Sequence, residues 1–220
     1  MIKLSRPNLG QEEIDSISEV ILSGNLVYGD VSQEFERQIC QYTNSKHASV
    51  VSSGTSALFV ALLAAGIGRG DAVIVPAFTF PATANAVIMT GAYPIFTDVE
   101  TSSYCISATA IQKAICQWKG KEIIRAVIPV HEFGFPANMA SIMTTCNKAG
   151  LLVIEDAACA IGATLNNVHV GTFGGAGCFS FHPRKTVTTG EGGAIITNNS
   201  NLHDKIQEFR NHGISLKSGY

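Results

Sequence analysis

The stretch IIRAVIPVHEFGFPANMASIMTTCNKAGLLVIED (123–156) indicates the fold, because it contains a strand, a helix and a second strand in that order. Its apolar runs at 123–129 and 151–155 are short and bounded by polar or turn residues, which is typical of buried strands. A segment of helical length lies between them at 137–150. Alternation of strands with helices predicts an α/β protein.

The same alternation extends along the chain from about residue 46. Further candidate strands lie at 47–51, 72–76, 93–97, 177–181 and 193–198. Further helical stretches lie at 55–66, 81–91, 107–119 and 200–212. Because the strands are apolar on both faces, we predict a mostly parallel sheet with helices on both faces. The helix at 55–66 is so uniformly apolar that we expect it to be fully buried.

The N-terminal segments 11–24 and 32–43 have the pattern of amphipathic helices, which we expect to pack on the core from outside. No low-complexity linker or solenoid repeat interrupts the chain. The prediction is therefore one domain, residues 1–220, in which N-terminal helices within 1–45 pack on an α/β core at 46–213.

Composition excludes several classes of protein. The 220 residues are 46% hydrophobic and 15% charged, which is enough apolar material for one sizeable core and argues against disorder. The formal net charge is -2 and no basic block is present, so nucleic-acid binding is not predicted as the main function. The six cysteines are spread singly, without metal-ligand spacing, which fits a reducing cytoplasm and predicts neither disulfides nor a zinc site.

Residues 72–97 carry no charge over a length sufficient to cross a bilayer. Prolines at 76, 81 and 94 and several Thr and Asn residues interrupt this stretch, so we interpret it as buried strand, loop and helix. The N-terminus lacks the apolar core of a signal peptide. Neither membrane insertion nor export is predicted, and the expected location is the cytoplasm.

Ligands of open α/β sheets bind at the carboxyl ends of strands, so the residues that follow each strand are candidates for a site. In SSGTS (52–56), Gly54 and Thr55 begin the apolar helix, where free amides can hold a phosphate. A simple glycine turn with a Ser or Thr cap gives the same pattern.

Two further strand ends carry ionisable side chains. Asp156 precedes a stretch, 157–183, without Asp, Glu, Lys or Arg. A desolvated carboxyl there needs a partner, either a cationic ring nitrogen or capping and backbone groups. Lys185 follows the strand at 177–181, which also carries the hydroxyl of Ser180. An amine in an apolar pocket forms Schiff bases with carbonyls, although most loop lysines are solvated.

Three other features bear on the choice of ligand. Phe80, in PAFTFPATAN (76–85), either presents a flat face to a ring or belongs to the core. His131 is the only one of six scattered histidines placed to line a strand-end pocket, so no metal site is predicted. The run GTFGGAG (171–177) lacks the G-x-G-x-x-G order of a dinucleotide loop, which argues against NAD.

Taken together, an aromatic face, a phosphate cradle, an acid and a lysine at four strand ends are the groups that a phosphorylated pyridine aldehyde needs. The predicted cofactor is therefore pyridoxal 5'-phosphate. Seven runs strengthen this prediction: SSGTSAL, GDAVIVPAFTFPATANAV, GAYPIFTDVE, PVHEFGFPANM, VIEDAACAIGA, VGTFGGAGCFSFHPRK and TTGEGGAIITN. In these runs the chain resembles the DegT/DnrJ/StrS family of sugar aminotransferases, which have the aspartate-aminotransferase (type I) fold. The resemblance is collinear from about residue 5 to residue 213.

The resemblance implies roles for six residues. Lys185 matches the lysine that binds the cofactor aldehyde and moves the proton between two carbons. Asp156 matches the acid that keeps the ring nitrogen protonated, so that the ring accepts electrons. Phe80 matches the aromatic residue that stacks on the ring. The positions that match phosphate-binding residues are Gly54, Thr55 and Ser180.

The resemblance also implies a reaction. An amino acid, usually glutamate, leaves its nitrogen on the cofactor, and a nucleotide-linked keto-sugar then takes it, with Lys185 as general base and general acid. Such enzymes are homodimers that serve amino-sugar or surface-polysaccharide biosynthesis. Cys159 departs from the Gln or His that the family often places near the cofactor's phenolic oxygen. It is either a weak donor there or a small buried side chain.

Family members are longer than this chain and continue into a smaller C-terminal domain that closes the active site. We therefore expect residues 1–220 to be the cofactor-binding large domain without that small domain. Two alternatives stay open. One is a truncated, catalytically silent binding or regulatory protein, and the other is an α/β domain without a cofactor.

Overall fold

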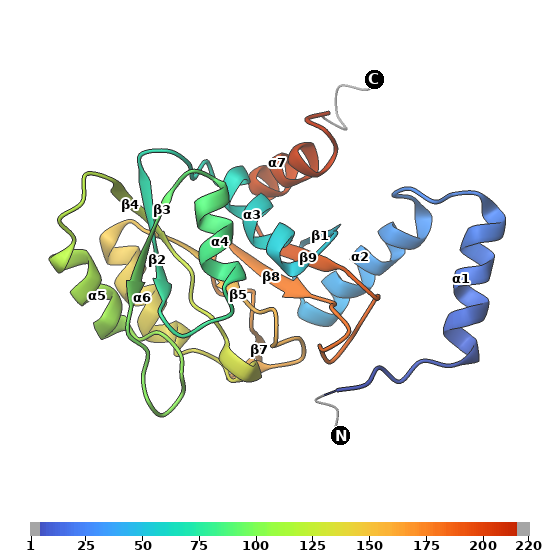
Figure 1. The fold of residues 1–220 in the computed structure, drawn as a ribbon, viewed down its shortest axis with the longest axis horizontal. Helices are drawn as coiled ribbons and strands as arrows, with labels where there is room; N and C mark the ends of the chain where they lie inside the picture. The colour runs from blue at the N-terminus through green and yellow to red at the C-terminus, as the bar shows by residue number, and fades with distance from the viewer. Residues whose placement is uncertain (1–4, 215–220) are drawn as a thin grey trace.

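The computed structural model describes residues 5–214 and contains a seven-stranded sheet with helices on both faces (Figure 1). Each of the seven predicted strands is present. They are β1 (His47–Val51), β2 (Asp71–Pro76), β3 (Tyr93–Thr97), β4 (Ile123–Val127), β5 (Leu152–Asp156), β8 (Ala176–Ser180) and β9 (Gly193–Thr197). Their order across the sheet is β1-β9-β8-β5-β4-β2-β3.

The helices fall where the sequence pattern indicates them. They are α1 (Gln11–Ser23), α2 (Asp30–Thr43), α3 (Gly54–Ala64), α4 (Ala82–Met89), α5 (Ala108–Gln117), α6 (Met139–Ala149) and α7 (Ser200–Arg210). Two small elements were not predicted: a 3-10 turn, η1 (Glu132–Gly134), and a hairpin of β6 (Thr164–Leu165) and β7 (Val168–His169).

The sheet is mostly parallel, as predicted. Strands β3, β2, β4, β5 and β8 pair in parallel, and β9 runs antiparallel to both β8 and β1. In the middle of the sheet Ile154 of β5 lies opposite Ala176 of β8, and Asp156 lies opposite Cys178. The carboxyl ends of the parallel strands therefore meet at one edge, where ligands of such sheets bind.

Side chains that alternate along the strands divide the core into two faces. On one face, Ile154 of β5 packs in a cluster with residues of α3, α4 and α7. On the other face, its neighbour Val153 packs with residues of α5 and α6. The helices on both faces confirm the predicted architecture. They also mean that consecutive residues of β5 face different surroundings.

Helix α3 is buried on one side only. Leu58, Ala61 and Leu62 are fully buried against the sheet, whereas Phe59 and Val60 are half-buried. The expectation of complete burial is therefore wrong for the outer side of this helix. The reason is that α4 and α7 flank α3 and leave part of that side uncovered.

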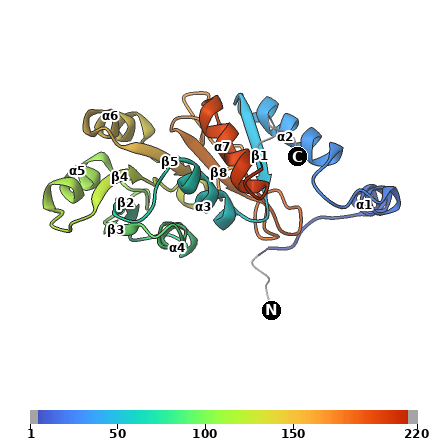
Figure 2. The same cartoon turned by 90° about the horizontal axis from the view of Figure 1, so that it is seen from above.

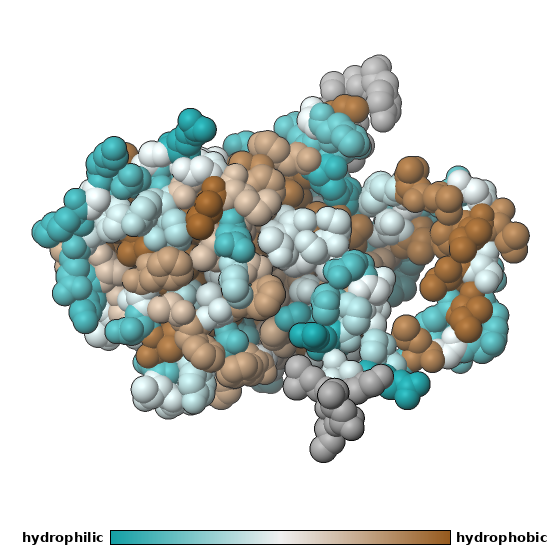
Figure 3. Space-filling view, in the orientation of Figure 1, coloured by the Kyte–Doolittle hydropathy of each residue, from teal (hydrophilic) through white to brown (hydrophobic). Residues whose placement is uncertain are grey.

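The two N-terminal helices differ in their packing. Helix α2 packs on β1 and buries Ile39 in a cluster with strand residues. Helix α1, which we expected on the core, has no buried residue and stands away from the sheet in both views (Figures 1 and 2). Its apolar side chains, Ile14, Ile17 and Ile21, are exposed, and hydrophobic surface gathers over this part of the molecule (Figure 3). Within residues 5–214 no element covers that face.

No helix between residues 5 and 214 is long and apolar enough to cross a membrane. The uncharged stretch at 72–97 forms β2, α4 and β3, which is the interpretation that its prolines suggested.

The structure predicts that two Leu→Ala substitutions lower the free energy of unfolding by very different amounts. Leu58→Ala in α3 removes a side chain that is 1% exposed, so it should lower the free energy of unfolding by about 2–5 kcal/mol. Leu22→Ala in α1, where the side chain is 86% exposed, should change it by less than about 0.5 kcal/mol. Urea denaturation followed by circular dichroism measures both. Equal costs for the two variants would contradict this placement of α1 and α3.

Candidate cofactor site

The predicted site residues lie at the carboxyl edge of the central strands. Asp156 is the last residue of β5, and Ser180 is the last residue of β8 beside it. Gly54 begins α3, close to Ser180, because a Cβ atom built on Gly54 would lie 2.8 Å from the Ser180 Cβ. Lys185 lies in the loop after β8. The fold thus brings together residues that are up to 131 positions apart in the sequence, from Gly54 to Lys185.

Asp156 is a buried carboxyl group, only 6% exposed, with two neutral donors. The Thr83 hydroxyl of α4 donates to Oδ2 at 2.8 Å, and the Ala158 amide donates to Oδ1 at 3.1 Å. Burial raises the pKa of Asp156 above its ordinary value, against the lowering effects of these two donors and of the Lys185 charge. A buried acid with raised pKa at a strand end gains stability from a cationic ligand.

Lys185 is half-buried and points toward the segment that follows β5. Its Nζ lies 2.9 Å from the sulfur of Cys159, and its positive charge acts on Asp156. Cys159 is exposed, so the interpretation of this residue as a small buried side chain is wrong. The amine, the thiol and the carboxyl therefore face a common space at the edge of the sheet.

The start of α3 has the geometry of an anion site. Ser53 caps the helix by accepting the Ser56 amide at 3.0 Å, which leaves the amides of Gly54 and Thr55 without an acceptor in the helix. These amides and the adjacent Ser180 hydroxyl can face an anion, and the helix dipole favours negative charge there. The interpretation of this run as a serine-capped turn is confirmed. The phosphate cradle at Gly54 and Thr55 stays a prediction.

Phe80 lies in the loop between β2 and α4 and is 76% exposed, so it is not a core residue. Its carbonyl accepts the amide of Thr83, the residue whose hydroxyl holds Asp156. The ring is thus carried by the same turn that contacts the buried acid, and its faces are free to pack against a planar ligand.

Sequence reasoning missed two residues at this edge. One is Thr83, which was placed in a helix but not recognised as the donor to Asp156. The other is Glu132, a half-buried carboxyl whose pKa is raised by burial and by the negative charge of Asp156, while Lys185 opposes the shift. Glu132 directly follows His131, so the strand-end rule that singled out His131 had the signal needed to find it.

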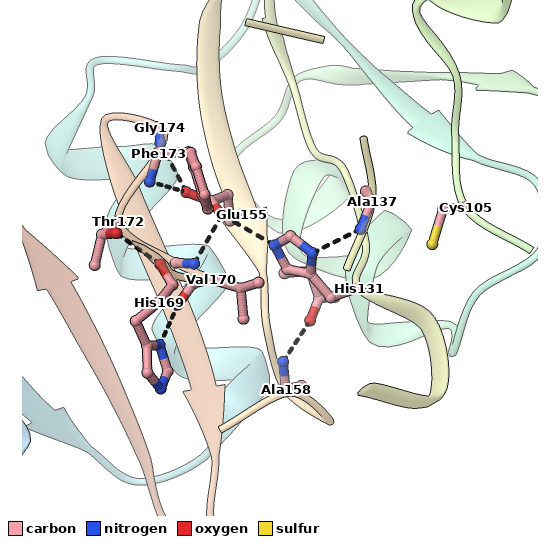
Figure 4. Close-up of polar contacts among 12 residues, drawn as sticks. Cys105, His131, Ala137, Glu155, Ala158, His169, Val170, Thr172, Phe173 and Gly174 are labelled. Carbon is pink, nitrogen blue, oxygen red and sulfur yellow. Dashed lines mark hydrogen bonds and ion pairs between the residues drawn. The ribbon is translucent and has the colours of Figure 1, made fainter. Parts of the chain in front are cut away.

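His131 itself does not line a pocket. It is fully buried, and its Nε2 lies 2.9 Å from the carboxyl of Glu155, another fully buried residue that sequence reasoning missed (Figure 4). Over residues 5–214 no group of three metal-ligating side chains occurs. All six cysteines are free thiols.

Comparison with known proteins identifies the family. The model of the DegT/DnrJ/EryC1/StrS aminotransferase family matches residues 7–219. The chain belongs to this family. The resemblance that the sequence motifs indicated is thereby confirmed.

Two curated relatives show how far the similarity extends. The chain is 41% identical over 206 residues to the UDP-N-acetyl-3-dehydro-alpha-D-glucosamine 3-aminotransferase of Acidithiobacillus ferrooxidans, covering 93% of this chain and 54% of that protein. It is 40% identical to the spore coat polysaccharide biosynthesis protein SpsC of Bacillus subtilis, covering 96% of this chain and 53% of that protein. The chain therefore spans about half the length of the curated relatives it matches.

Solved structures support the same fold. An aminotransferase from Psychrobacter cryohalolentis superposes with a TM-score of 0.91 at 37% identity, covering 98% of this chain and 54% of that one. The NtdA protein of Bacillus subtilis with bound cofactor PMP superposes with a TM-score of 0.84 at 33% identity. The match covers 94% of this chain and 46% of that one. The predicted aspartate-aminotransferase-like fold is confirmed.

Aminotransferases of this family use pyridoxal phosphate, and the residues at the sheet edge fit that group. A pyridinium nitrogen matches the buried acid Asp156, an aldehyde matches the amine of Lys185, and a phosphate matches the free amides at the start of α3. The donor set is therefore complementary to the charged ends of the cofactor.

The close approach of Gly54 to Ser180 generates a prediction about stability. In Gly54→Ala the new methyl group meets the Ser180 Cβ at 2.8 Å, so the variant should lose about 1–3 kcal/mol of unfolding free energy. Adding Ser180→Gly removes the contact and should restore most of the loss. Chemical denaturation measures both, with Gly68→Ala, where the methyl group meets only ordinary contacts, as the control. No recovery in the double variant would contradict the packing of α3 against β8.

Asp156 generates a prediction about pH. A carboxyl group whose native pKa is raised stabilises the fold at acid pH and loses that contribution as the pH rises through the native pKa. Without cofactor, Asp156→Asn should therefore be more stable than the unaltered chain at neutral pH, and the difference should shrink as the pH falls toward the ordinary Asp range. Asn suits the site, because the Thr83 hydroxyl can accept as well as donate.

Thermal unfolding at several pH values tests this prediction, with the exposed Asp98→Asn as a control for the change in net charge. A neutral-pH stability lower in Asp156→Asn than in the unaltered chain would show that the hydrogen bonds to the carboxylate outweigh its desolvation.

Proposed function

We propose that this chain binds pyridoxal 5'-phosphate and acts in the transfer of an amino group from an amino acid to a nucleotide-linked keto-sugar. The observation that carries the proposal is the meeting of Lys185, Asp156 and the Gly54–Ser180 contact at one edge of the sheet, in a member of a sugar aminotransferase family. We further propose that residues 1–220 form one cofactor-binding domain.

When bound, pyridoxal phosphate supplies an aldehyde that condenses with amines and a pyridine ring that accepts an electron pair. Asp156 would hold the proton of the ring nitrogen, since its two donors, Thr83 and Ala158, leave acceptor capacity on the carboxylate. A positive charge at this position also removes the cost of ionising a buried acid.

Lys185 would supply the amine of the site. Its amine would hold the aldehyde end of the cofactor, and as general base and general acid it would take a proton from the substrate carbon and return it to the neighbouring one. The loop after β8 brings Lys185 Nζ to 2.9 Å from the sulfur of Cys159. The charge of this amine also acts on the half-buried carboxyl of Glu132, whose pKa it lowers against the effect of burial.

The remaining predicted residues would bind and orient. The Gly54 and Thr55 amides and the Ser180 hydroxyl would hold the phosphate at the positive end of α3. The exposed ring of Phe80 would pack on the pyridine face. Each of these contacts fixes the ring relative to Lys185, and positioning of this kind lowers the barrier to proton transfer.

The substrates and assembly are proposed from the relatives. The name of the Acidithiobacillus ferrooxidans relative specifies a UDP-linked dehydro-sugar, which supports a nucleotide-linked keto-sugar as the acceptor. Polysaccharide biosynthesis in the name of the Bacillus subtilis relative supports an amino-sugar pathway. Glutamate as the donor, a homodimer as the working unit and a cytoplasmic location follow from the family resemblance.

Borohydride trapping tests the cofactor site. After incubation with pyridoxal phosphate and reduction, peptide mass spectrometry should find the pyridoxyl group on Lys185. Lys185→Ala should abolish this adduct, whereas Lys148→Ala, which removes an exposed lysine on α6, should leave it unchanged. Labelling spread over surface lysines would contradict the assignment of Lys185.

The same preparation distinguishes an enzyme from a silent binding protein. If the chain is catalytically competent, glutamate converts the bound aldehyde to the amine form, which absorbs at shorter wavelength. Binding at Lys185 without conversion by glutamate or by any other amino acid would support a binding or regulatory protein instead.

A further inference from the structure

Glu155 is the most completely satisfied buried charge among the described residues. It is 0% exposed, and four donors surround its two oxygens (Figure 4). Oε1 accepts the amides of Phe173 at 2.8 Å and Gly174 at 2.7 Å, and Oε2 accepts the Gly171 amide at 2.7 Å and lies 2.9 Å from His131 Nε2. Because each partner is a donor, these surroundings suit the ionised carboxylate.

The glycine-rich run at 171–177 therefore binds an internal anion. Its amides point inward at Glu155 (Figure 4). The close approach requires glycine at Gly174, where a Cβ atom would lie 2.5 Å from the Val153 carbonyl oxygen. This run, which is not a dinucleotide loop, uses the same physics of convergent amides to hold a carboxylate of its own chain.

His131 joins Glu155 to the loop after β4. Its Nδ1 accepts the Ala137 amide at 3.1 Å, so the ring proton lies on Nε2 and is donated to Glu155. Both ring nitrogens are used, and each anchors a different segment. The imidazole is therefore held in one tautomer and one orientation.

The same pair holds the backbone of Asp156. The amide of His131 donates to the Asp156 carbonyl at 3.0 Å, and the Asp156 amide donates to the Pro129 carbonyl at 2.9 Å. Since side chains alternate along β5, Glu155 points to the face of Val153, whereas Asp156 points to the face of Ile154 and to Thr83. The hydrogen bonds that hold the Glu155 side chain on one face therefore keep β5 from turning about its axis, and they set the direction of the Asp156 side chain on the other face.

The pair also supports the lysine side of the site. The Gly134 amide donates to the His131 carbonyl at 3.1 Å, which closes the turn that carries Glu132. A Cβ atom on Gly134 would lie 3.0 Å from the Cys159 carbonyl oxygen, so this turn packs on the segment whose thiol contacts Lys185.

We propose that Glu155 and His131 are positioning residues for the cofactor acid, holding the end of β5 so that the Asp156 carboxylate faces the ring nitrogen of pyridoxal phosphate. This inference rests on the proposed function. A buried hydrogen-bond network in which every member has its partners holds the chain in one geometry, and this is the benefit of the Glu155–His131 contact. Neither residue touches the cofactor, and both act through Asp156 and the segment at 131–137.

Two substitutions of His131 separate its two hydrogen bonds. In His131→Gln the side-chain nitrogen replaces Nε2 and keeps the donor to Glu155, whereas in His131→Asn the side-chain oxygen replaces Nδ1 and keeps only the Ala137 contact. His131→Asn should weaken pyridoxal phosphate binding about tenfold or more, and His131→Gln by no more than about threefold. Glu155→Gln, which places an amide group among donors, should weaken it at least as much as His131→Asn.

A second readout distinguishes positioning from stability. With ¹⁵N-labelled pyridoxal phosphate, the ring-nitrogen signal should shift toward the unprotonated position in His131→Asn and stay near that of the unaltered chain in His131→Gln. His169→Gln is the matched control, because this buried histidine accepts the Gly162 amide without contacting Glu155. It should lower the thermal midpoint and leave the ring-nitrogen signal unchanged.

The outcomes separate the two claims. If the unaltered chain forms no adduct on Lys185, the proposed function fails. If it forms the adduct and the His131→Asn and His131→Gln variants bind the cofactor equally well with the same ring-nitrogen signal, the positioning inference is overturned and the cofactor site stands. Should Glu155→Gln fail to fold, the comparison of the two His131 variants decides the matter alone.

Discussion

A carboxylate that is removed from water at the end of the central strand is the constraint on which the site depends. Asp156 is buried with only two neutral donors, so its ionised form is costly until a positive group arrives. The fold tolerates this cost at one position, near the amine of Lys185. A cation that binds beside Asp156 would recover the stability lost by ionising this buried carboxyl.

The two neighbouring acids of β5 illustrate how burial can have opposite consequences. Glu155 receives four donors and serves as an internal anchor, while Asp156, one residue later on the opposite face, receives two and is left with acceptor capacity. The difference comes from the strand's alternation, which directs one carboxyl to the amides of 171–174 and the other to α4. Of these two adjacent carboxyl groups, Glu155 therefore anchors the chain internally, and Asp156 keeps acceptor capacity at the edge of the sheet.

Much of this arrangement could be predicted from the sequence. Apolar runs marked the strands, and the lack of charge from 157 to 183 singled out Asp156 as a desolvated acid. Glu155 could not be singled out, because three of its donors lie 16 to 19 positions further on and the fourth, His131, lies 24 positions earlier, through contacts that only the folded chain creates. The packing of α1 could not be predicted either, since an amphipathic pattern shows that a face is apolar without showing what covers it.

A crystal structure of the chain grown with pyridoxal phosphate would show whether the buried acid receives the ring nitrogen. We expect electron density continuous with Lys185 Nζ, a ring nitrogen within hydrogen-bond distance of the Asp156 carboxylate, and a phosphate on the Gly54 and Thr55 amides. A cofactor bound through another lysine, or with its ring nitrogen away from Asp156, would show that Asp156 and Lys185 do not form the cofactor site.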